Sequence, residues 1–414
     1  MLKLQVYSES VVEKLGIKTR VGEDALPFVN HVGMFVADGM GGSAGIRVVS
    51  LHPDCFFPEK LAQRISNYCV PDRYHGTVEA DLTSYVKSNF SSLASPEMLS
   101  LYQDSRCSGK LKKSGYIGSH VLGTLMAAIL LALEKEIVDY PYSWWRMVTE
   151  TLPDELIADY QELIQLLEPE CGKTCIDKID YYGTTLSAAL YREDGDYIDV
   201  CFWNCGDSRS YVWDQDGFRQ AAEDQGRKGG MTSRFSLSDG CQIQISREWK
   251  RYKKPCVLYS MTDGVYGCFA GKNGFPSTPL FMEVFLLNVL VSASSLLEVE
   301  KLLTETFDQY QQLDDSHSMA MAAFGFDAYS ELQAAARNRL LKLEEIYDLK
   351  NMPDDFFVED YVKKTMEESG SPVAMNKLQK IKEKQLLVFD NYLRHHLSEV
   401  SKDKFLDVEK NGWI

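Results

Sequence analysis

An aspartate followed by a glycine stands at the end of two strongly apolar segments. Residues 32–37 run into Asp38 and Gly39, and residues 257–261 lead through one threonine into Asp263 and another glycine. Segments this short and this apolar are typical of buried strands. A carboxylate fixed at a strand end, beside a backbone that can turn sharply, can serve as a ligand for a hard metal ion. Taken singly, either aspartate could equally belong to an ordinary Asp-Gly turn.

Other acidic residues along the chain could complete such a site. Glu23 and Asp24 are adjacent and precede the first apolar segment, Asp207 lies in a Gly-Asp-Ser-Arg step, and Asp315 precedes the apolar segment 319–326. Several carboxylates at the ends of strands, without clustered histidines, favour hard divalent ions such as Mg²⁺ or Mn²⁺. Without a cation, that many acids in one place would repel one another strongly.

Two of these segments have a plainer interpretation that the sequence leaves open. The segment that contains Arg20 and Glu23 could be a charged surface turn, or Arg20 could bind the oxygens of a phosphate group beside the metal ions. The Gly-Asp step at Asp207 lies inside a strand-like segment, so it indicates either a bulge or a close approach to a ligand.

The overall composition argues against several classes of function. The 414 residues include 44 basic and 60 acidic side chains, and the formal net charge of −16 disfavours nucleic acid or an anionic membrane as the main partner. The 10 cysteines form no Cys-x-x-Cys pair, which argues against a zinc site. The sequence starts without a signal-peptide core, and its longest apolar segment is too short to cross a bilayer. We expect a cytoplasmic protein with reduced thiols.

Apolar periodicity predicts the elements that position these residues. The Gly-, Ser- and Lys-rich segment 105–119 indicates a loop. From about residue 328 onward we expect charged amphipathic helices, which either pack on the main body or bind a partner. Strands are predicted at 32–37, 181–191, 197–213, 257–261 and 319–326, and helices at 121–137, 279–290, 296–310 and 332–349.

Six short motifs follow one another along the chain, and they span about residues 15–327. They are Glu23-Asp24, Asp38-Gly39-Met40-Gly41-Gly42, Gly183-Thr184-Thr185, Gly206-Asp207-Ser208-Arg209, Asp263-Gly264 and Asp315-Ser316-His317-Ser318. Each motif is weak by itself, but together and in order they are specific. Their order resembles that of the metal-dependent protein serine/threonine phosphatases of the PP2C type (the PPM family), in their bacterial-like form.

The resemblance implies an α+β fold, a four-layer αββα sandwich in which two antiparallel sheets lie between layers of helices. The metal ions would lie at one end of this sandwich. The implied phosphatase domain covers residues 1–327, with a helical insertion within about 52–180. Residues 328–414 would form a C-terminal α-helical extension, which the resemblance does not cover.

The resemblance also implies a set of ligands for two Mn²⁺ or Mg²⁺ ions. By position, Asp38 would bridge the two ions. Glu23 and the carbonyl group of Gly39 would bind one ion, and Asp263 and Asp315 would bind the other.

Three positions depart from the family pattern or extend it. Asp207 matches an acid that helps to bind a third, weaker ion in some members, but Gly267 replaces an acid that often accompanies it. Arg20 would bind the phosphate, although it stands three residues before the glutamate where the family usually has four. Ser316 replaces the asparagine that usually follows the last aspartate.

The implied activity is hydrolysis of phosphoserine and phosphothreonine in proteins by a water that bridges the two ions. The implied partners are a phosphorylated protein substrate and a cognate serine/threonine kinase in a signalling role, with neither nucleic acid nor membrane involved. The helical tail would bind a partner or self-associate. The residues alone indicate only a phosphomonoester. Two alternatives remain open, a pseudophosphatase or scaffold that acts through its tail and a small-molecule phosphomonoesterase.

Overall fold

The fold was derived from a computed structural model of the chain. It describes residues 1–8, 11–14, 17–20, 23–39, 84–85, 88, 113–136, 140–167, 183–222, 235, 243–266, 280–310 and 316–346.

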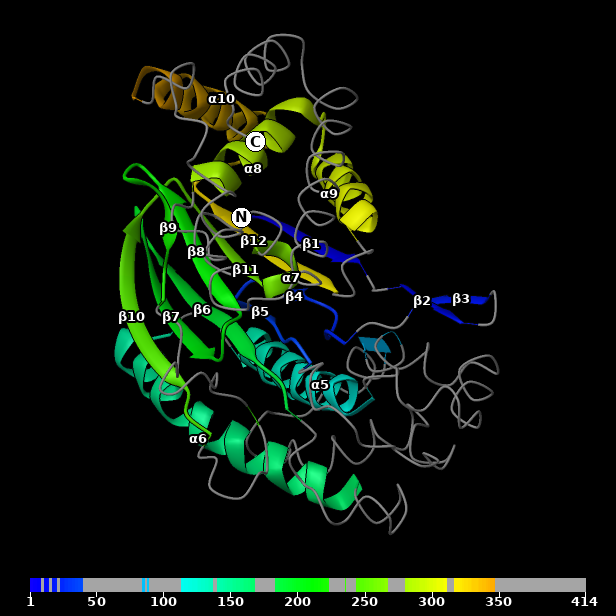
Figure 1. Ribbon diagram of the computed structural model, residues 1–414. Helices are drawn as coiled ribbons and strands as arrows, with labels where there is room; N and C mark the ends of the chain where they lie inside the picture. The colour runs from blue at the N-terminus through cyan, green and yellow to red at the C-terminus, as the bar shows by residue number, and fades with distance from the viewer. Residues whose placement is uncertain are drawn as a thin grey trace, which may run out of the picture.

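Two antiparallel five-stranded sheets form the centre of the protein (Figure 1). The strand order is β1-β12-β11-β8-β9 in the first sheet and β10-β7-β6-β5-β4 in the second. A separate hairpin, formed by β2 and β3, projects beyond both sheets. The strands are β1 (Leu2–Ser8), β2 (Val11–Lys14), β3 (Ile17–Arg20), β4 (Phe28–Val29), β5 (Gly33–Val36), β6 (Leu186–Asp194), β7 (Tyr197–Cys205), β8 (Arg209–Asp214), β9 (Gly217–Gln220), β10 (Ser246–Lys253), β11 (Cys256–Met261) and β12 (His317–Phe324).

The two sheets pack face to face through an apolar interior. Val200 and Phe202 of β7 and Leu258 of β11 are fully buried in this layer. Across the interface, the ring of Tyr191 on β6 meets the ring of Phe324 on β12 edge to face, with centroids 4.8 Å apart. Alternation of side chains along each strand directs one set into this interior and the other set toward the helices.

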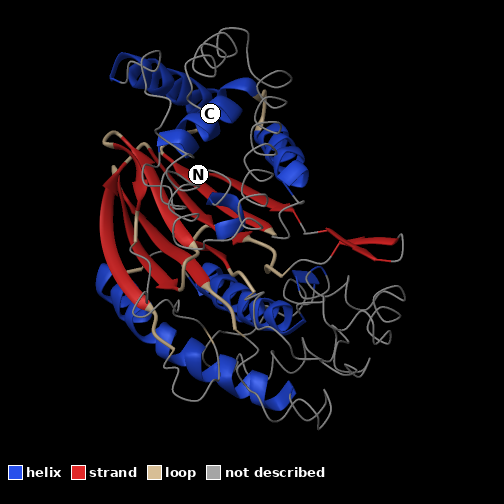
Figure 2. Ribbon diagram, in the orientation of Figure 1, coloured by secondary structure: helices blue, strands red, loops and turns tan. Residues whose placement is uncertain are grey.

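Helices cover the outer face of each sheet (Figure 2). The apolar side chains of α5 and α6 cluster with those of β5, β6 and β7, and the apolar side chains of α8, α9 and α10 cluster with those of β1, β11 and β12. The expected α+β fold, a four-layer αββα sandwich, is therefore confirmed. The helices are α5 (Lys113–Glu136), α6 (Tyr142–Leu167), α7 (Asp263–Tyr266), α8 (Leu280–Ser292), α9 (Leu296–Tyr310) and α10 (Tyr329–Ile346).

Helix α5 corrects the predicted loop at 105–119, because the helix begins at Lys113. Residues 121–133 are all buried, as the apolar pattern predicts, but Ser119 and His120 are buried as well. The Ser119 hydroxyl donates a hydrogen bond to the Glu23 carbonyl oxygen at 2.5 Å, so a tertiary contact holds polar residues in the helix. In the part of the chain that the structure describes, no helix is long and apolar enough to cross a membrane.

The segment predicted as one interrupted strand, 197–213, is two strands in different sheets. Strand β7 belongs to the second sheet and β8 belongs to the first. The chain changes sheets at Gly206, which has a φ angle of +97°. Glycine adopts this backbone conformation without the steric cost of a side chain. The Gly-Asp step is therefore a crossover between the sheets, and the bulge interpretation is wrong.

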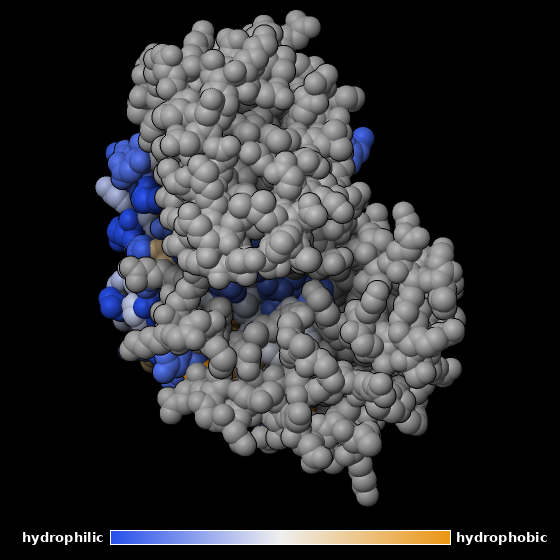
Figure 3. Space-filling model, viewed as in Figure 1, coloured by the Kyte–Doolittle hydropathy of each residue, from blue (hydrophilic) through white to orange (hydrophobic). Residues whose placement is uncertain are grey.

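The edge strand β10 is protected by charged side chains. Figure 3 shows hydrophilic surface along the edge where β10 lies in the same orientation. Some of these side chains are fixed by ion pairs, such as Arg247 Nη2 with Asp154 Oδ1 at 2.6 Å. Charged residues on an edge strand discourage pairing with another chain. The charged residues of β10 are Arg247, Glu248, Lys250, Arg251 and Lys253.

The first helix of the predicted C-terminal extension packs on the sandwich. Leu332 and Ala336 of α10 are fully buried against α8 and the first sheet. Arg339 Nε donates a hydrogen bond to Glu283 Oε1 of α8 at 2.7 Å, and the Glu283 side chain is only 4% exposed. The described parts of the predicted insertion, α5 and α6, likewise form an outer layer. The domain limit at residue 327 and the extent of the insertion stay predictions.

We predict that Leu332→Ala lowers the free energy of unfolding by about 2–5 kcal/mol, because it removes a fully buried side chain. Leu341→Ala on the same helix is the control, since Leu341 is 48% exposed, and its effect should be within about 0.5 kcal/mol. Urea unfolding measures both. A small and equal effect for both variants would show that α10 does not pack as described.

Candidate metal centre

Asp38 lies just beyond the end of β5, where two threonines hold its backbone. The Asp38 amide donates to the Thr185 hydroxyl at 3.1 Å, and the Thr185 amide donates to the Asp38 carbonyl oxygen at 2.8 Å. The Thr184 hydroxyl donates to the same carbonyl oxygen at 2.9 Å. The Thr185 hydroxyl also lies 2.5 Å from the hydroxyl of Ser208, at the crossover between the sheets. These bonds satisfy the backbone at a strand end and fix the direction of the chain there.

Gly39 sits where two other backbone segments approach closely. A Cβ atom at this position would meet the carbonyl oxygens of Glu23 and Gly115 well inside van der Waals contact. Gly39 also forms an isolated bridge with Thr184. The absence of a side chain at residue 39 therefore lets Glu23, the start of α5 and the Asp38 turn meet.

Glu23 is buried and its backbone is bonded on two sides. Its amide donates to the Ser316 hydroxyl at 3.2 Å, directly before β12, and its carbonyl oxygen accepts the bond from Ser119 on α5. Glu23 is 6% exposed and its neighbour Asp24 is fully buried. Both members of the acidic pair are thus inside the protein rather than at its surface.

Asp24 lies beside the candidate ligands, although the sequence analysis did not select it as one of them. Both of its carboxylate oxygens are buried and meet no hydrogen-bond donor in good geometry among the described residues. Burial raises the pKa of Asp24 to about 6 and the negative charge of Asp263 adds to this, against the opposing effect of polar groups on Asp38, Thr262 and Ser318. The side chains of Asp24, Asp38 and Asp263 therefore lie near one another. The adjacent Glu-Asp pair was the available signal.

Asp263 begins α7, and one residue, Thr262, separates it from the end of β11. The preceding Thr262 is tied to the start of β12, because its amide donates to the Ser318 carbonyl oxygen at 3.0 Å and its hydroxyl accepts from the Ser318 amide at 3.0 Å. The Ser318 hydroxyl donates in turn to the Ala25 carbonyl oxygen at 3.1 Å. Asp263 Oδ1 is buried without a donor among the described residues. Three distant parts of the sequence are thus held together.

Asp207 is at the same end of the sandwich, in the crossover from β7 to β8. Its carbonyl oxygen accepts a hydrogen bond of 2.7 Å from the hydroxyl of Tyr266 on α7. The guanidinium carbon of Arg209 lies 4.2 Å from the centre of the Tyr266 ring. This connects the Gly-Asp-Ser-Arg motif to the helix that starts at Asp263. The role of Asp207 as a ligand of a third ion stays a prediction.

Other predicted site residues lie outside the described residues. Asp315 and Gly267 are outside them altogether, and so is the side chain of Arg20. The backbone of Arg20 ends β3, in the hairpin that projects beyond the sandwich (Figure 1). The proposed roles of Asp315 and Arg20 therefore stay predictions.

The carboxylate groups at this end of the sandwich suit hard divalent cations, although they do not enclose an ion. In the described part of the chain, no three side chains of histidine, cysteine, aspartate or glutamate lie close enough to hold one metal ion. However, both oxygens of Asp24 and one of Asp263 are buried acceptors without a hydrogen-bond donor among the described residues. A cation can compensate buried carboxylate oxygens of this kind, and oxygen ligands suit Mg²⁺ and Mn²⁺.

No protein-family model matches the sequence, and no characterised protein has a significantly similar sequence. Among solved structures, the chain is similar to the catalytic domain of the serine/threonine protein phosphatase PstP in complex with two manganese ions, with 14% identity, a TM-score of 0.42, and coverage of 78% of this chain and 97% of that one.

Two further bacterial structures are similar to a comparable degree. The serine/threonine phosphatase Stp1 from Staphylococcus aureus has 13% identity and a TM-score of 0.40, with coverage of 78% of this chain and 95% of that one. The PPM Ser-Thr phosphatase MsPP from Mycobacterium smegmatis, in complex with cacodylate, has 13% identity and a TM-score of 0.34, with coverage of 78% and 99%. Likeness at this level does not assign the chain to a family.

We predict that Thr185→Val lowers the free energy of unfolding by about 1–3 kcal/mol. The substitution keeps the shape of the side chain but leaves the buried Asp38 amide without its acceptor. Thr151→Val is the matched control, because the exposed Thr151 hydroxyl bonds only to a carbonyl of its own helix, and its effect should be within about 0.5 kcal/mol. Denaturant unfolding compares them. Equal losses for the two variants would mean that Thr185 does not hold the Asp38 turn.

Proposed function

We propose that the protein is a metal-dependent phosphatase that hydrolyses phosphoserine and phosphothreonine in proteins. The observation that carries the proposal is the burial of Glu23, Asp24 and Asp38 at one end of the sandwich, where one carboxylate oxygen of Asp263 is also buried. The hydrogen bonds at that end connect the acidic pair, the Asp-Gly turn, the Gly-Thr-Thr segment and the start of β12. These are the motifs whose order resembles the PP2C type.

The proposed ligands come from separate elements. Asp38 would bridge two Mn²⁺ or Mg²⁺ ions. Glu23 and the Gly39 carbonyl would also bind one ion, and Asp263 and Asp315 would also bind the other. When bound, such ions lower the pKa of a shared water and polarise the phosphoryl oxygens. A third ion would involve Asp207.

The protein's own contribution is to fix the carboxylates and to supply their charge. The two threonines and Ser208 hold the Asp38 backbone, so that its side chain is aimed without further rearrangement. The grouped negative charge of Asp24, Asp38 and Asp263 creates a potential that favours divalent cations. Arg20 would bind the phosphate of the substrate.

The substrate class rests on the resemblance, because the residues alone indicate a phosphomonoester. The proposed partners are a phosphorylated protein and a cognate serine/threonine kinase, in a cytoplasmic signalling role. The residues beyond α10 would bind a partner or a second copy of the chain. We propose no nucleic-acid or membrane partner, in keeping with the net charge of −16.

We predict that the purified protein hydrolyses p-nitrophenyl phosphate when Mn²⁺ is added, and that EDTA abolishes the reaction. Asp38→Asn and Asp263→Asn should each lower kcat/KM by roughly 100-fold or more, since a bound metal contributes several kcal/mol to transition-state stabilisation. Asp216→Asn is the control, because Asp216 is exposed in the turn between β8 and β9, and it should leave the rate unchanged.

Equal and negligible rates for the wild type and Asp38→Asn would contradict the proposed phosphatase activity and favour a pseudophosphatase or scaffold. Phosphopeptides and nucleotides then separate the two catalytic alternatives. The proposal expects a higher kcat/KM for phosphoserine and phosphothreonine peptides, and preference for nucleotides would indicate a small-molecule phosphomonoesterase.

A further inference from the structure

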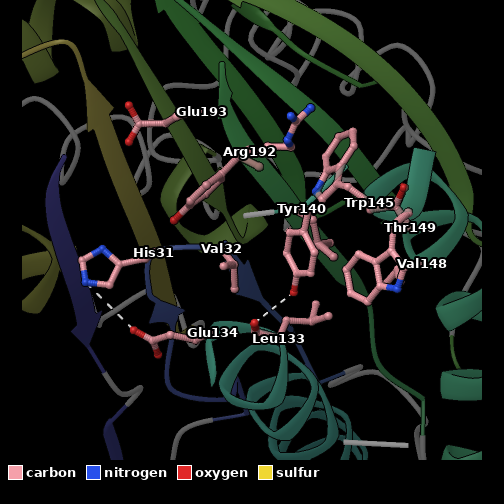
Figure 4. A pocket seen from close by; sticks show the side chains of 13 residues that line it. His31, Val32, Leu133, Glu134, Tyr140, Trp145, Val148, Thr149, Arg192 and Glu193 are labelled. Atoms are coloured by element: carbon pink, nitrogen blue, oxygen red, sulfur yellow. Dashed lines mark hydrogen bonds and ion pairs between the residues drawn. The ribbon is translucent and has the colours of Figure 1, made fainter. Parts of the chain in front are cut away.

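Two cavities lie at the end of the sandwich opposite the candidate metal centre. They differ in how many of their polar groups already have a partner within the protein. The first has a volume of about 420 Å³ and aromatic walls that include Tyr140 (Figure 4). Its polar groups have partners within the protein. His31 Nε2 lies 3.9 Å from Glu134 Oε1, the Tyr140 hydroxyl donates to the Leu133 carbonyl oxygen at 3.1 Å, and Arg192 pairs with a neighbouring aspartate. This cavity therefore offers a ligand few polar groups that could bind it.

The second cavity, which we call the α10 pocket, has a volume of about 390 Å³ and lies between α10 and two turns of the sheets. Residues of the β8–β9 turn and the β10–β11 turn form one side, and residues of α10 form the other. The apolar part of its lining is Trp213, Pro255 and Phe326. The volume falls within the range of small-molecule sites, about 300–1,000 Å³.

The α10 pocket is basic in a strongly acidic chain. Its charged lining comprises Lys253, Lys254, Arg339, Lys342 and a single acid, Asp214. Three of these groups are neutralised by neighbours outside the pocket. Lys254 Nζ lies 2.9 Å from a glutamate of β6, Arg339 is bonded to the buried glutamate of α8, and Asp214 binds an arginine of β9 at 2.6 Å.

Lys253 and Lys342 are the two remaining basic residues of the pocket lining. Neither has an ion pair with any residue in the described part of the chain, and both are exposed. The amide side chains of Gln215 and Asn338 also line the pocket without a hydrogen bond to a described residue. Two cations and two amides thus border an apolar lining, and all four are available to a ligand.

We propose that the α10 pocket binds a small organic anion. An apolar ring would lie against Trp213, Pro255 and Phe326, and a phosphate or carboxylate group would lie between Lys253 and Lys342. Lysine is a regular phosphate ligand that acts as a point charge. The amides add hydrogen bonds to the polar part of the ligand.

The pocket is separate from the candidate metal centre and does not depend on the proposed function. Strand β11 connects the two places, with Pro255 at one end and Asp263 just beyond the other. At about 3.3 Å per residue, this separation is roughly 25 Å. Binding at the pocket can therefore be tested without metal ions.

The two lysines come from different elements, which gives the ligand a structural effect. Lys253 ends β10 and Lys342 belongs to α10, so an anion between them joins the helix to the sheet. A bound ligand therefore stabilises the packing of α10, and the melting temperature rises with ligand concentration.

The test uses adenosine 5′-monophosphate as a probe that combines an aromatic ring with a dianion. Isothermal titration calorimetry on the full chain in EDTA, without divalent ions, should show one binding site. The Lys253→Ala/Lys342→Ala double variant should bind at least about tenfold more weakly, because it removes two charge-assisted contacts. Adenosine and inorganic phosphate should each bind more weakly than the nucleotide.

Two controls locate the site. Lys301→Ala removes an exposed lysine on α9, and Asp38→Asn alters the metal centre, so both variants should bind the probe as the wild type does. No binding to the wild type, equal binding to the double variant, or loss of binding in Asp38→Asn would overturn the proposal. If inorganic phosphate bound as tightly as the nucleotide, the apolar lining would not contribute to binding, and the proposal of an organic ligand would be overturned. A Lys253→Gln/Lys342→Gln variant should lose binding in the same way, and a melting temperature without ligand that is no lower than that of the wild type excludes misfolding as the cause.

Discussion

The burial of several carboxylates together is the constraint on which the rest of this structure depends. A negative charge removed from water without a partner is costly, and like charges close together raise the cost further. The pKa of Asp24 reflects this cost, because burial and the negative charge of Asp263 both raise it. A fold retains such a cost where it serves a site. A divalent cation is the partner that would remove it.

The fold holds these carboxylates with short hydroxyl side chains at strand ends. Thr185 and Ser208 lie on one side of Asp38, and Ser316 and Ser318 lie on the side of β12. Backbone groups at a strand end have no ladder partner, and a hydroxyl can donate and accept in little space. This explains why a serine or threonine stands next to Asp207, Asp263 and Asp315.

The sequence predicted those features that depend on local pattern. The apolar periodicity predicted helix 296–310, which is α9, and the apolar segments predicted β11 and β12 closely. The order of the motifs predicted the four-layer sandwich. Local pattern could not predict which sheet a strand joins, so the sequence did not predict the crossover at Gly206.

Other features depend on contacts between distant segments. The first turns of α5 resemble a loop in composition, but Ser119 is fixed by its bond to Glu23. The choice between Glu23 and Asp24 as a site residue depends on where each side chain points, which adjacency in sequence does not reveal. The α10 pocket joins residues from β8, β10, α10 and the segments beside them, among them Lys253 and Lys342, which no motif connects.

The central claim is that the carboxylates around Asp38 bind divalent metal ions. Anomalous diffraction from crystals soaked in Mn²⁺ tests it most directly. The account predicts two strong peaks that share Asp38, with Glu23 and the Gly39 carbonyl on one ion and Asp263 with Asp315 on the other. It also predicts that both peaks disappear in crystals of Asp38→Asn. Crystals that diffract well and show no manganese at Asp38 would contradict the account.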